Sequence, residues 1–193
     1  MTKDIFADRK KALEDEYFRK KESELIEKLR RRAEDESRRQ ALADATGIAD
    51  EEILNDLQEL GFTRDTIELL HFVPLVQTAW ASGVVTPEEK ELVLELTGFR
   101  SIFQNINAYR QLLEWLDTKP SNDFFQKTLQ IIQDILQALP KVEREAQATD
   151  LVEYCTRIAQ ASGGILGFGN KMSSGEREVL EKIAAALESK RRS

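Results

Sequence analysis

The stretch Ala79-Trp80-Ala81-Ser82-Gly83 has a near-copy eighty residues later, Ala159-Gln160-Ala161-Ser162-Gly163. Each copy ends an apolar run with helical spacing and is followed by a loop and an acidic helix start. When Glu89 is aligned with Glu176, the helices that follow match in register, with seven extra residues in the second loop. A unit that recurs in this way predicts an internal repeat of helix, glycine loop and capped helix. Its junction residues are Ser82, Gly83, Glu89, Ser162, Gly163 and Glu176.

The rest of the chain carries apolar stripes at helical spacing and no strand pattern, which predicts an all-α bundle of about seven helices with a long N-terminal helix. The expected helices cover about 50–60, 63–82, 86–97, 101–117, 122–139, 141–162 and 173–189. Pro74 lies inside the second of these and must kink or divide it. Thr86, Pro87 and Glu89 form a helix start with a capping box. The residues expected to be buried are Leu129, Ile132, Leu136, Leu180 and Ile183.

Residues 1–45 differ from the remainder, which we expect to be one helical domain spanning 50–193. They hold 13 Lys/Arg and 12 Asp/Glu, against 15 and 23 in the rest, and no Gly or Pro precedes Gly47. Acidic residues repeatedly stand four positions before basic ones, as in Glu24–Lys28 and Glu27–Arg31, an order that supports an isolated helix. A strict heptad is not sustained, so a coiled coil is less expected than a projecting helical arm.

Composition excludes several classes of function. The net charge of −7 argues against a general nucleic-acid binder, because neutralising phosphates requires a basic surface. No apolar stretch reaches the length of a membrane span and none at the start resembles a signal peptide, so we expect a cytoplasmic protein, peripheral to a membrane complex as an alternative. One cysteine, Cys155, cannot form an internal disulfide.

Candidate catalytic and metal-binding groups are few, and we expect no enzyme, no cofactor and no metal site. His71 is the single histidine, so a histidine-rich metal site is excluded and a catalytic triad lacks its usual base. It lies in an apolar run and is expected to be packed or hydrogen-bonded, and Cys155, on the apolar stripe of its helix, is expected to pack. The glycine-rich segment 163–173 lacks the spacing of a phosphate-binding loop. Its apolar Ile165, Leu166 and Phe168 indicate docking onto the bundle or a partner. The acidic clusters around Glu89 and Glu176 are expected to cap their helices.

The run Val73-Pro74-Leu75-Val76-x-x-Ala79-Trp80-Ala81-x-Gly83, followed by Thr86-Pro87-Glu88-Glu89, resembles the TerB-like domain. That helical fold is associated with tellurite-resistance proteins and with the N-terminal domain of membrane-linked DnaJ-type co-chaperones. The resemblance covers about residues 50–190 and implies a helical module that acts through protein contacts, in stress responses or near a membrane. Ser82 and Ser162 stand where the family often has aspartate, so a cation-binding role is not carried over to them.

The N-terminal pattern Phe6-Ala7-Asp8-Arg9-Lys10-Lys11-Ala12-Leu13-Glu14-x-x-Tyr17 is similar to the start of bacterial zeta-type inhibitors of the F1 ATPase. That likeness implies a helix that inserts into a rotary enzyme.

Three hypotheses of function follow. The first is a non-enzymatic, regulatory protein-interaction module that binds a partner, or a second copy of itself, through the N-terminal helix. The second is a regulator of an ATPase acting through the same helix. The third is a metal-binding stress protein. The residues expected to contact a partner are Phe6, Asp8, Arg9, Leu13, Tyr17, Phe18, Leu25, Ile165, Leu166 and Phe168.

Overall fold

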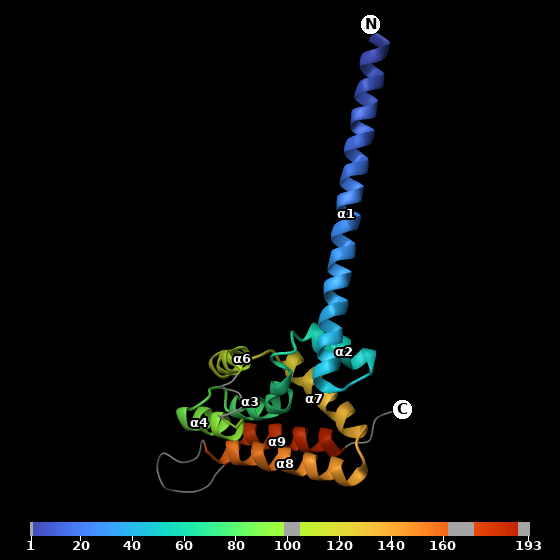
Figure 1. The fold of residues 1–193 in the computed structure, drawn as a ribbon. Coiled ribbons are helices and arrows are strands. Elements are labelled where there is room, and N and C mark those ends of the chain that lie inside the picture. The colour runs from blue at the N-terminus through green and yellow to red at the C-terminus, as the bar shows by residue number, and fades with distance from the viewer. Residues whose placement is uncertain (1, 99–104, 162–171, 189–193) are drawn as a thin grey trace.

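A computed structural model of the chain describes residues 2–98, 105–161 and 172–188, with side chains described from residue 16 onward. Over those residues the chain forms eight α-helices and one 3-10 helix, and no strand (Figure 1). The elements are α1 (Thr2–Thr46), α2 (Glu51–Glu59), η1 (Ile67–Phe72), α3 (Val73–Ala79), α4 (Pro87–Leu96), α6 (Ile106–Asp117), α7 (Asn122–Gln137), α8 (Lys141–Ala161) and α9 (Ser174–Glu188). The predicted all-α class is confirmed, while its TerB-like detail stays a prediction.

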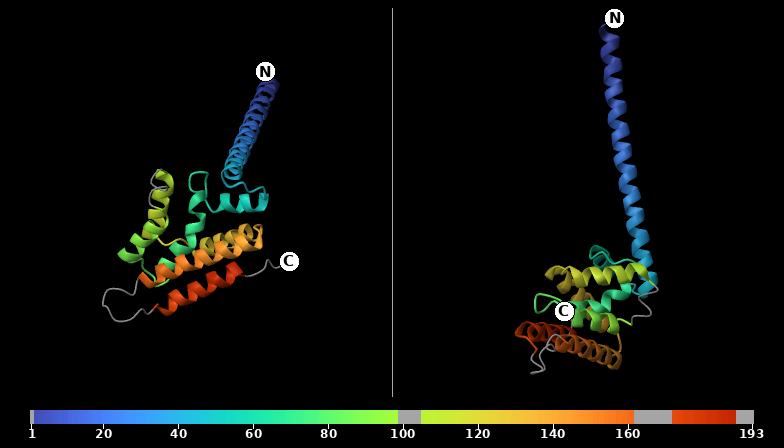
Figure 2. Two further views of the ribbon diagram at one scale, coloured as in Figure 1. Left: turned by 60° about the horizontal axis from the view of Figure 1, so that its bottom comes forward. Right: turned by 90° about the vertical axis from the view of Figure 1, so that its left-hand side faces the viewer.

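The long helix α1 stands away from the compact body formed by the other helices (Figures 1 and 2). It runs unbroken from Thr2 to Thr46, and Gly47, with φ of 70°, ends it in the left-handed region that glycine accepts without strain. Ion pairs between successive turns, such as Arg31 with Glu27 at 3.0 Å, support the exposed part. The single N-terminal helix expected from the sequence is therefore present.

The last two turns of α1, residues 39–46, belong to the body and form what we call the foot of the helix. Leu42 has no exposed surface and lies in the hydrophobic core. Arg39 donates to the side chain of Asn55 in α2 at 3.2 Å. We call residues 2–38 the arm, and the predicted division of the chain at residue 45 stays a prediction.

Pro74 divides the helical run expected over residues 63–82. The 3-10 helix η1 ends at Phe72, and α3 begins at Val73, so the proline falls in the first turn of α3, where its missing N–H costs no hydrogen bond. Thr63 does not cap a helix. Its backbone N–H donates to the Thr66 side chain at 2.9 Å within a turn.

The starts of α6 and α7 are fixed by side chains that accept hydrogen bonds from the free backbone N–H groups of the first turn. Asn105 accepts from the N–H groups of Asn107 and Ala108, and Ser121 accepts from that of Phe124 at 3.0 Å. The first of these helices was expected from about residue 101, but Asn105 is its N-cap and α6 begins at Ile106. Ile106 is exposed rather than packed.

The core lies where α3 and α7 cover the pair α8 and α9, which run side by side (Figures 1 and 2). Ile132, Leu136, Leu180 and Ile183 are buried there, as expected from their stripes. Leu129, also expected to be buried, is only partly so and packs at the edge of the core. The Trp80 side chain donates to the Trp115 carbonyl oxygen at 2.7 Å, a hydrogen bond that connects the first repeat motif to α6.

Candidate functional site

The described part of the arm carries large apolar side chains that are exposed to solvent. Tyr17, Phe18 and Leu25 are 58%, 65% and 57% exposed, and Ile26 and Leu29 are exposed by more than half as well. These side chains are surrounded by charged residues. Such a set of exposed side chains is unusual for a solvated spacer, because burying a large apolar side chain gains about 1.5–3 kcal/mol.

Phe18, Leu25 and Leu29 lie on one face of the arm, since about 3.6 residues make a turn of α-helix. We call these three residues the anchor stripe. Tyr17 adjoins the stripe through an edge-to-face contact with Phe18, with ring centroids 5.9 Å apart. The Lys21 ammonium lies 5.9 Å from the centre of the Tyr17 ring. An aromatic pair with a cation beside it is therefore exposed on the arm.

Four further residues expected to contact a partner, Phe6, Asp8, Arg9 and Leu13, lie on α1, but their side chains are outside the described residues. Ile165, Leu166 and Phe168 fall wholly outside the described residues, as do Ser162 and Gly163. The expectations for these nine positions stay predictions.

Glu89 and Glu176 begin α4 and α9 with the same local arrangement. The Glu89 carboxylate accepts from the backbone N–H of Thr86 at 2.8 Å, and the Thr86 hydroxyl accepts from the N–H of Glu89 at 3.2 Å. Ser173 and Glu176 repeat this reciprocal pair, at 2.6 and 3.2 Å. Both glutamates therefore stand at the third helical position of a capping box, which confirms their expected capping role.

Neither capping glutamate reaches solvent, which the sequence pattern did not indicate. The exposed fractions of Glu89 and Glu176 are 0% and 1%. Burial raises the pKa of Glu89 above its ordinary range, against the hydrogen bonds from Thr86, and the negative charge of Glu176 raises it further. One carboxylate oxygen of Glu89, Oε1, has no hydrogen-bond partner within the described ranges. The buried charge of Glu176 thus adds to the desolvation that opposes the ionisation of Glu89.

The two segments that the sequence predicts to be repeats approach each other at Gly175. A Cβ atom at this position would lie 2.6 Å from the carbonyl oxygen of Ala81, in the first repeat motif. Glycine is therefore required where the start of α9 approaches the end of α3. In the same motif, Gly83 has a φ of 97°, and the exposed Ser82 donates to the Val84 carbonyl oxygen at 2.9 Å. Ser82 and Gly83 thus shape the turn that follows α3.

Cys155 and His71 differ in their surroundings. Cys155 is fully buried, and burial raises the pKa of its thiol to about 12, against a weak opposing effect of the Thr78 hydroxyl. It acts as a small apolar side chain, as expected. His71, which was expected to be packed or hydrogen-bonded, is exposed at the edge of a groove described below.

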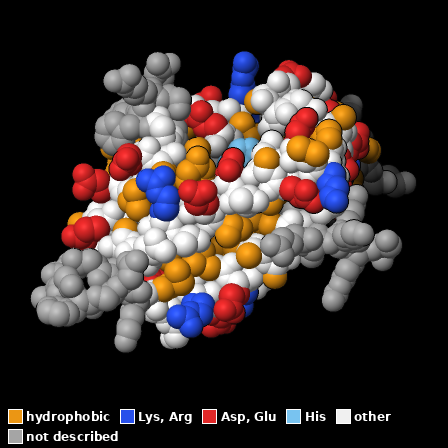
Figure 3. Space-filling model, turned by 90° about the horizontal axis from the view of Figure 1, so that it is seen from below, with side chains coloured by type: hydrophobic (Ala, Val, Ile, Leu, Met, Phe, Trp, Pro, Cys, Tyr) orange, Lys and Arg blue, Asp and Glu red, His pale blue; other side chains and the backbone are white. Residues whose placement is uncertain are grey.

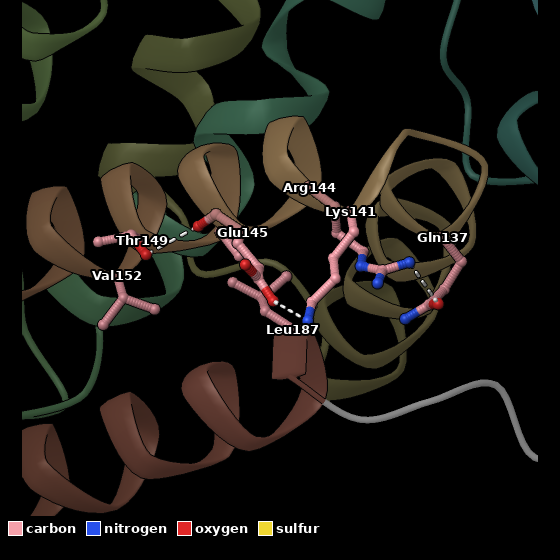
Figure 4. Close-up of a pocket in the computed structure, with 8 residues that line it drawn as sticks. Gln137, Lys141, Arg144, Glu145, Thr149, Val152 and Leu187 are labelled. Atoms are coloured by element: carbon pink, nitrogen blue, oxygen red, sulfur yellow. Dashed lines mark hydrogen bonds and ion pairs between the residues drawn. The ribbon is translucent and has the colours of Figure 1, made fainter.

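A cavity of about 620 Å³ lies between the end of α7, the first half of α8 and the end of α9 (Figure 4). Its charged groups interact with one another. Lys141 pairs with Glu145 at 3.7 Å, and Arg144 donates to Gln137 at 3.3 Å. Ala148, Val152 and Leu187 supply the apolar wall. The Thr149 hydroxyl, also in the lining, donates to the backbone carbonyl oxygen of Glu145 at 2.7 Å.

Within residues 2–98, 105–161 and 172–188 there is no group of three or more side chains suited to hold a metal ion. None of the helices in these ranges has the combination of length and apolar character that crossing a bilayer requires.

Fold and surface together define an all-α bundle that displays a charged helix with an exposed apolar stripe. Comparison of the chain with models of protein families, with curated proteins and with solved structures gives no significant match.

Proposed function

We propose that the protein is a non-enzymatic interaction module that binds protein partners through the arm of α1. The single observation that carries this proposal is the anchor stripe with Tyr17, a set of large apolar side chains left exposed on a helix that stands away from the body. Helix-in-groove recognition uses apolar anchors at spacings of three, four and seven residues. Phe18, Leu25 and Leu29 are separated by seven and four.

The charges beside the stripe support recognition of an acidic surface. Arg19, Lys20 and Lys21 directly follow Phe18, and Arg30, Arg31 and Arg32 directly follow Leu29. Basic groups next to an apolar anchor accelerate encounter with an acidic partner and disfavour basic ones. The partner therefore offers an apolar groove with an acidic rim.

The body anchors the C-terminal end of this helix. Leu42 anchors the foot in the core, and Gln58 of α2 donates to the backbone carbonyl of Asp35 at 3.3 Å. These contacts fix where the arm leaves the bundle while the anchor stripe stays free. A module of this design needs no reacting groups.

The test uses the full-length chain with a matched pair of substitutions. Phe18→Asp places a charge in the anchor stripe, and Ser23→Asp adds the same charge on the opposite face of the same exposed helix. Each protein serves as bait in an extract of the cells that make it, with quantitative mass spectrometry of what is retained. Partners should be retained by the wild type and by Ser23→Asp and lost with Phe18→Asp. Equal retention by all three would show that the arm is not the binding surface.

A further inference from the structure

A groove of about 200 Å³ lies on the body between the junction of η1 with α3, the second half of α7 and the middle of α8. We call it the α7/α8 groove. Its floor is apolar and includes the buried Leu75, Ile132 and Leu136. Asp150 and Tyr154 of α8 stand at its rim, where both are exposed. The single histidine, pale blue in Figure 3, marks this region beside hydrophobic side chains on the face opposite to the arm.

The arm cannot reach the groove of its own body. Phe18 lies 24 residues before the buried Leu42, which at about 1.5 Å per residue separates them by roughly 36 Å. The helix between them is continuous, with no Gly or Pro at which it could fold back. Whatever covers the aromatic pair of the arm is therefore another molecule.

We infer that the α7/α8 groove receives the arm of a second copy of this chain, with Tyr17 and Phe18 as the inserted side chains. This inference rests on the proposed function and names the partner. An aromatic side chain buries about 150–250 Å² when it inserts, and an apolar floor with a polar rim is the kind of site it enters.

Charge supports the same pairing. Arg19, Lys20 and Lys21 follow the aromatic pair, and Asp150 stands at the rim of the groove with no ion pair among the described residues. The two parts of the chain also differ in net charge, which is +1 for residues 1–45 and −8 for the remainder. An arm is therefore attracted to the body of another copy and only weakly to another arm.

Pairing of two arms with each other fits the sequence less well. A coiled-coil seam needs apolar residues at heptad spacing along the helix. Seven residues before Phe18 stands Lys11, and seven residues after Leu25 and Leu29 stand Arg32 and Glu36. The apolar stripe is therefore too short for a coiled-coil seam. An arm in the groove of another copy is a head-to-tail contact, which forms a closed dimer where each arm reaches the other copy's groove and a longer assembly where it does not.

The test is sedimentation velocity of the full chain over a range of concentrations, with one substitution on each side of the junction. Phe18→Asp removes an anchor, and Asp150→Arg reverses the charge at the groove. Their controls are Ser23→Asp, on the opposite face of the arm, and Glu145→Arg, the same charge reversal on the opposite face of α8. All four positions are exposed, so the body stays folded, which circular dichroism checks.

Wild type and both controls should self-associate, and each test variant should raise the dissociation constant of self-association at least about tenfold. An equal mixture of Phe18→Asp and Asp150→Arg should associate more strongly than either alone, because one copy keeps an intact groove and the other an intact arm. Loss with Phe18→Asp but not with Asp150→Arg would mean arm-to-arm contact and overturn the inference. A wild type that stays monomeric would overturn it too. If the wild type stays monomeric but still retains partners from a cell extract in a manner that depends on Phe18, the proposed function holds and only this inference fails.

Discussion

Glu89 and Glu176 hold equivalent places in two helix starts, each buried at the third position of a capping box. Their charges interact, and that of Glu176 adds to the burial that raises the pKa of Glu89. A capping glutamate ordinarily lies on the surface, where its charge interacts favourably with the helix dipole. Here the packing of the two repeats removes both carboxylates from water, so capping is retained at a cost in desolvation.

Replacing Glu89 by glutamine should not destabilise the protein at pH 7. Glutamine also serves at this position of a capping box, so its side-chain oxygen keeps the bond from the Thr86 N–H while the buried charge is removed. Glu89→Ala loses this bond and should cost about 0.5–2 kcal/mol, the usual range for a lost cap. Urea denaturation of both variants measures the difference. A Glu89→Gln protein as unstable as Glu89→Ala would contradict the argument.

The stability of Glu89→Gln should depend on pH differently from that of the wild type. Because the folded protein raises the pKa of Glu89, it binds this proton more tightly than the unfolded chain does. The contribution of Glu89 is therefore fully present below the ordinary glutamate range and is lost as the pH rises through the raised value. The advantage of Glu89→Gln over wild type should grow from pH 4 to pH 7. Parallel stability curves would show that Glu89 does not titrate in this interval.

Gly175→Ala should destabilise the protein even though it places a better helix former in α9. Alanine gains about 0.8–1 kcal/mol of helix propensity over glycine. Its Cβ would however meet the Ala81 carbonyl oxygen at 2.6 Å, a backbone atom that moves only with α3. Overpacking of this kind costs about 1–3 kcal/mol or more, so a net loss is expected. Thermal denaturation beside the exposed Ser174→Ala provides the comparison, and a raised melting temperature for Gly175→Ala would refute the close contact.

Truncation of two leucines of α1 should destabilise the protein by very different amounts. Leu42→Ala should cost about 2–5 kcal/mol, because the side chain is fully buried in the core. Leu25→Ala, at a side chain more than half exposed, should change the free energy of unfolding by no more than about 0.5 kcal/mol. Chemical denaturation followed by tryptophan fluorescence reports on the body in both cases. Similar losses would mean that the arm packs on the body in solution.

Cys155 should resist thiol reagents in the folded protein. With a pKa raised to about 12, only about one thiol in 10⁴ is ionised at pH 8, and the side chain has no exposed surface. Reaction with Ellman's reagent should therefore be complete in denaturant and follow the rate of unfolding in its absence. Rapid labelling of the native protein would mean that α8 opens readily.

Much of the fold was predictable because its signals are local. The apolar stripes of α7 and α9, the division at Pro74 and the capping box at Thr86 all depend on residues within a few positions of one another. Leu129 was predicted wrongly because spacing alone does not tell the centre of a buried face from its edge. The start of the helix expected from about residue 101 differs because Asn105 caps α6, which begins at Ile106.

What the sequence could not supply depends on contacts between distant segments. Leu42 stands between alanines after a long charged run, and only its packing against the body assigns it to the core. A signal was present in the small-residue stretch Ala41-Leu42-Ala43 shortly before Gly47. The requirement for glycine at 175 likewise arises from Ala81, more than ninety residues away. The superposition of the two half-repeats as a whole stays a prediction, since the second copy of the motif is only partly described.

The continuous α1 has one more consequence, which concerns screening by salt. At physiological ionic strength an electric field decays over about 8 Å, the Debye length. Phe18 lies 17 residues, or roughly 26 Å of helix, before Asp35, where α2 contacts α1, which is about three such lengths. The net charge of −8 on the body therefore exerts almost no force at the aromatic pair. An acidic surface that the bundle would repel can approach the end of its helix as though the bundle were absent.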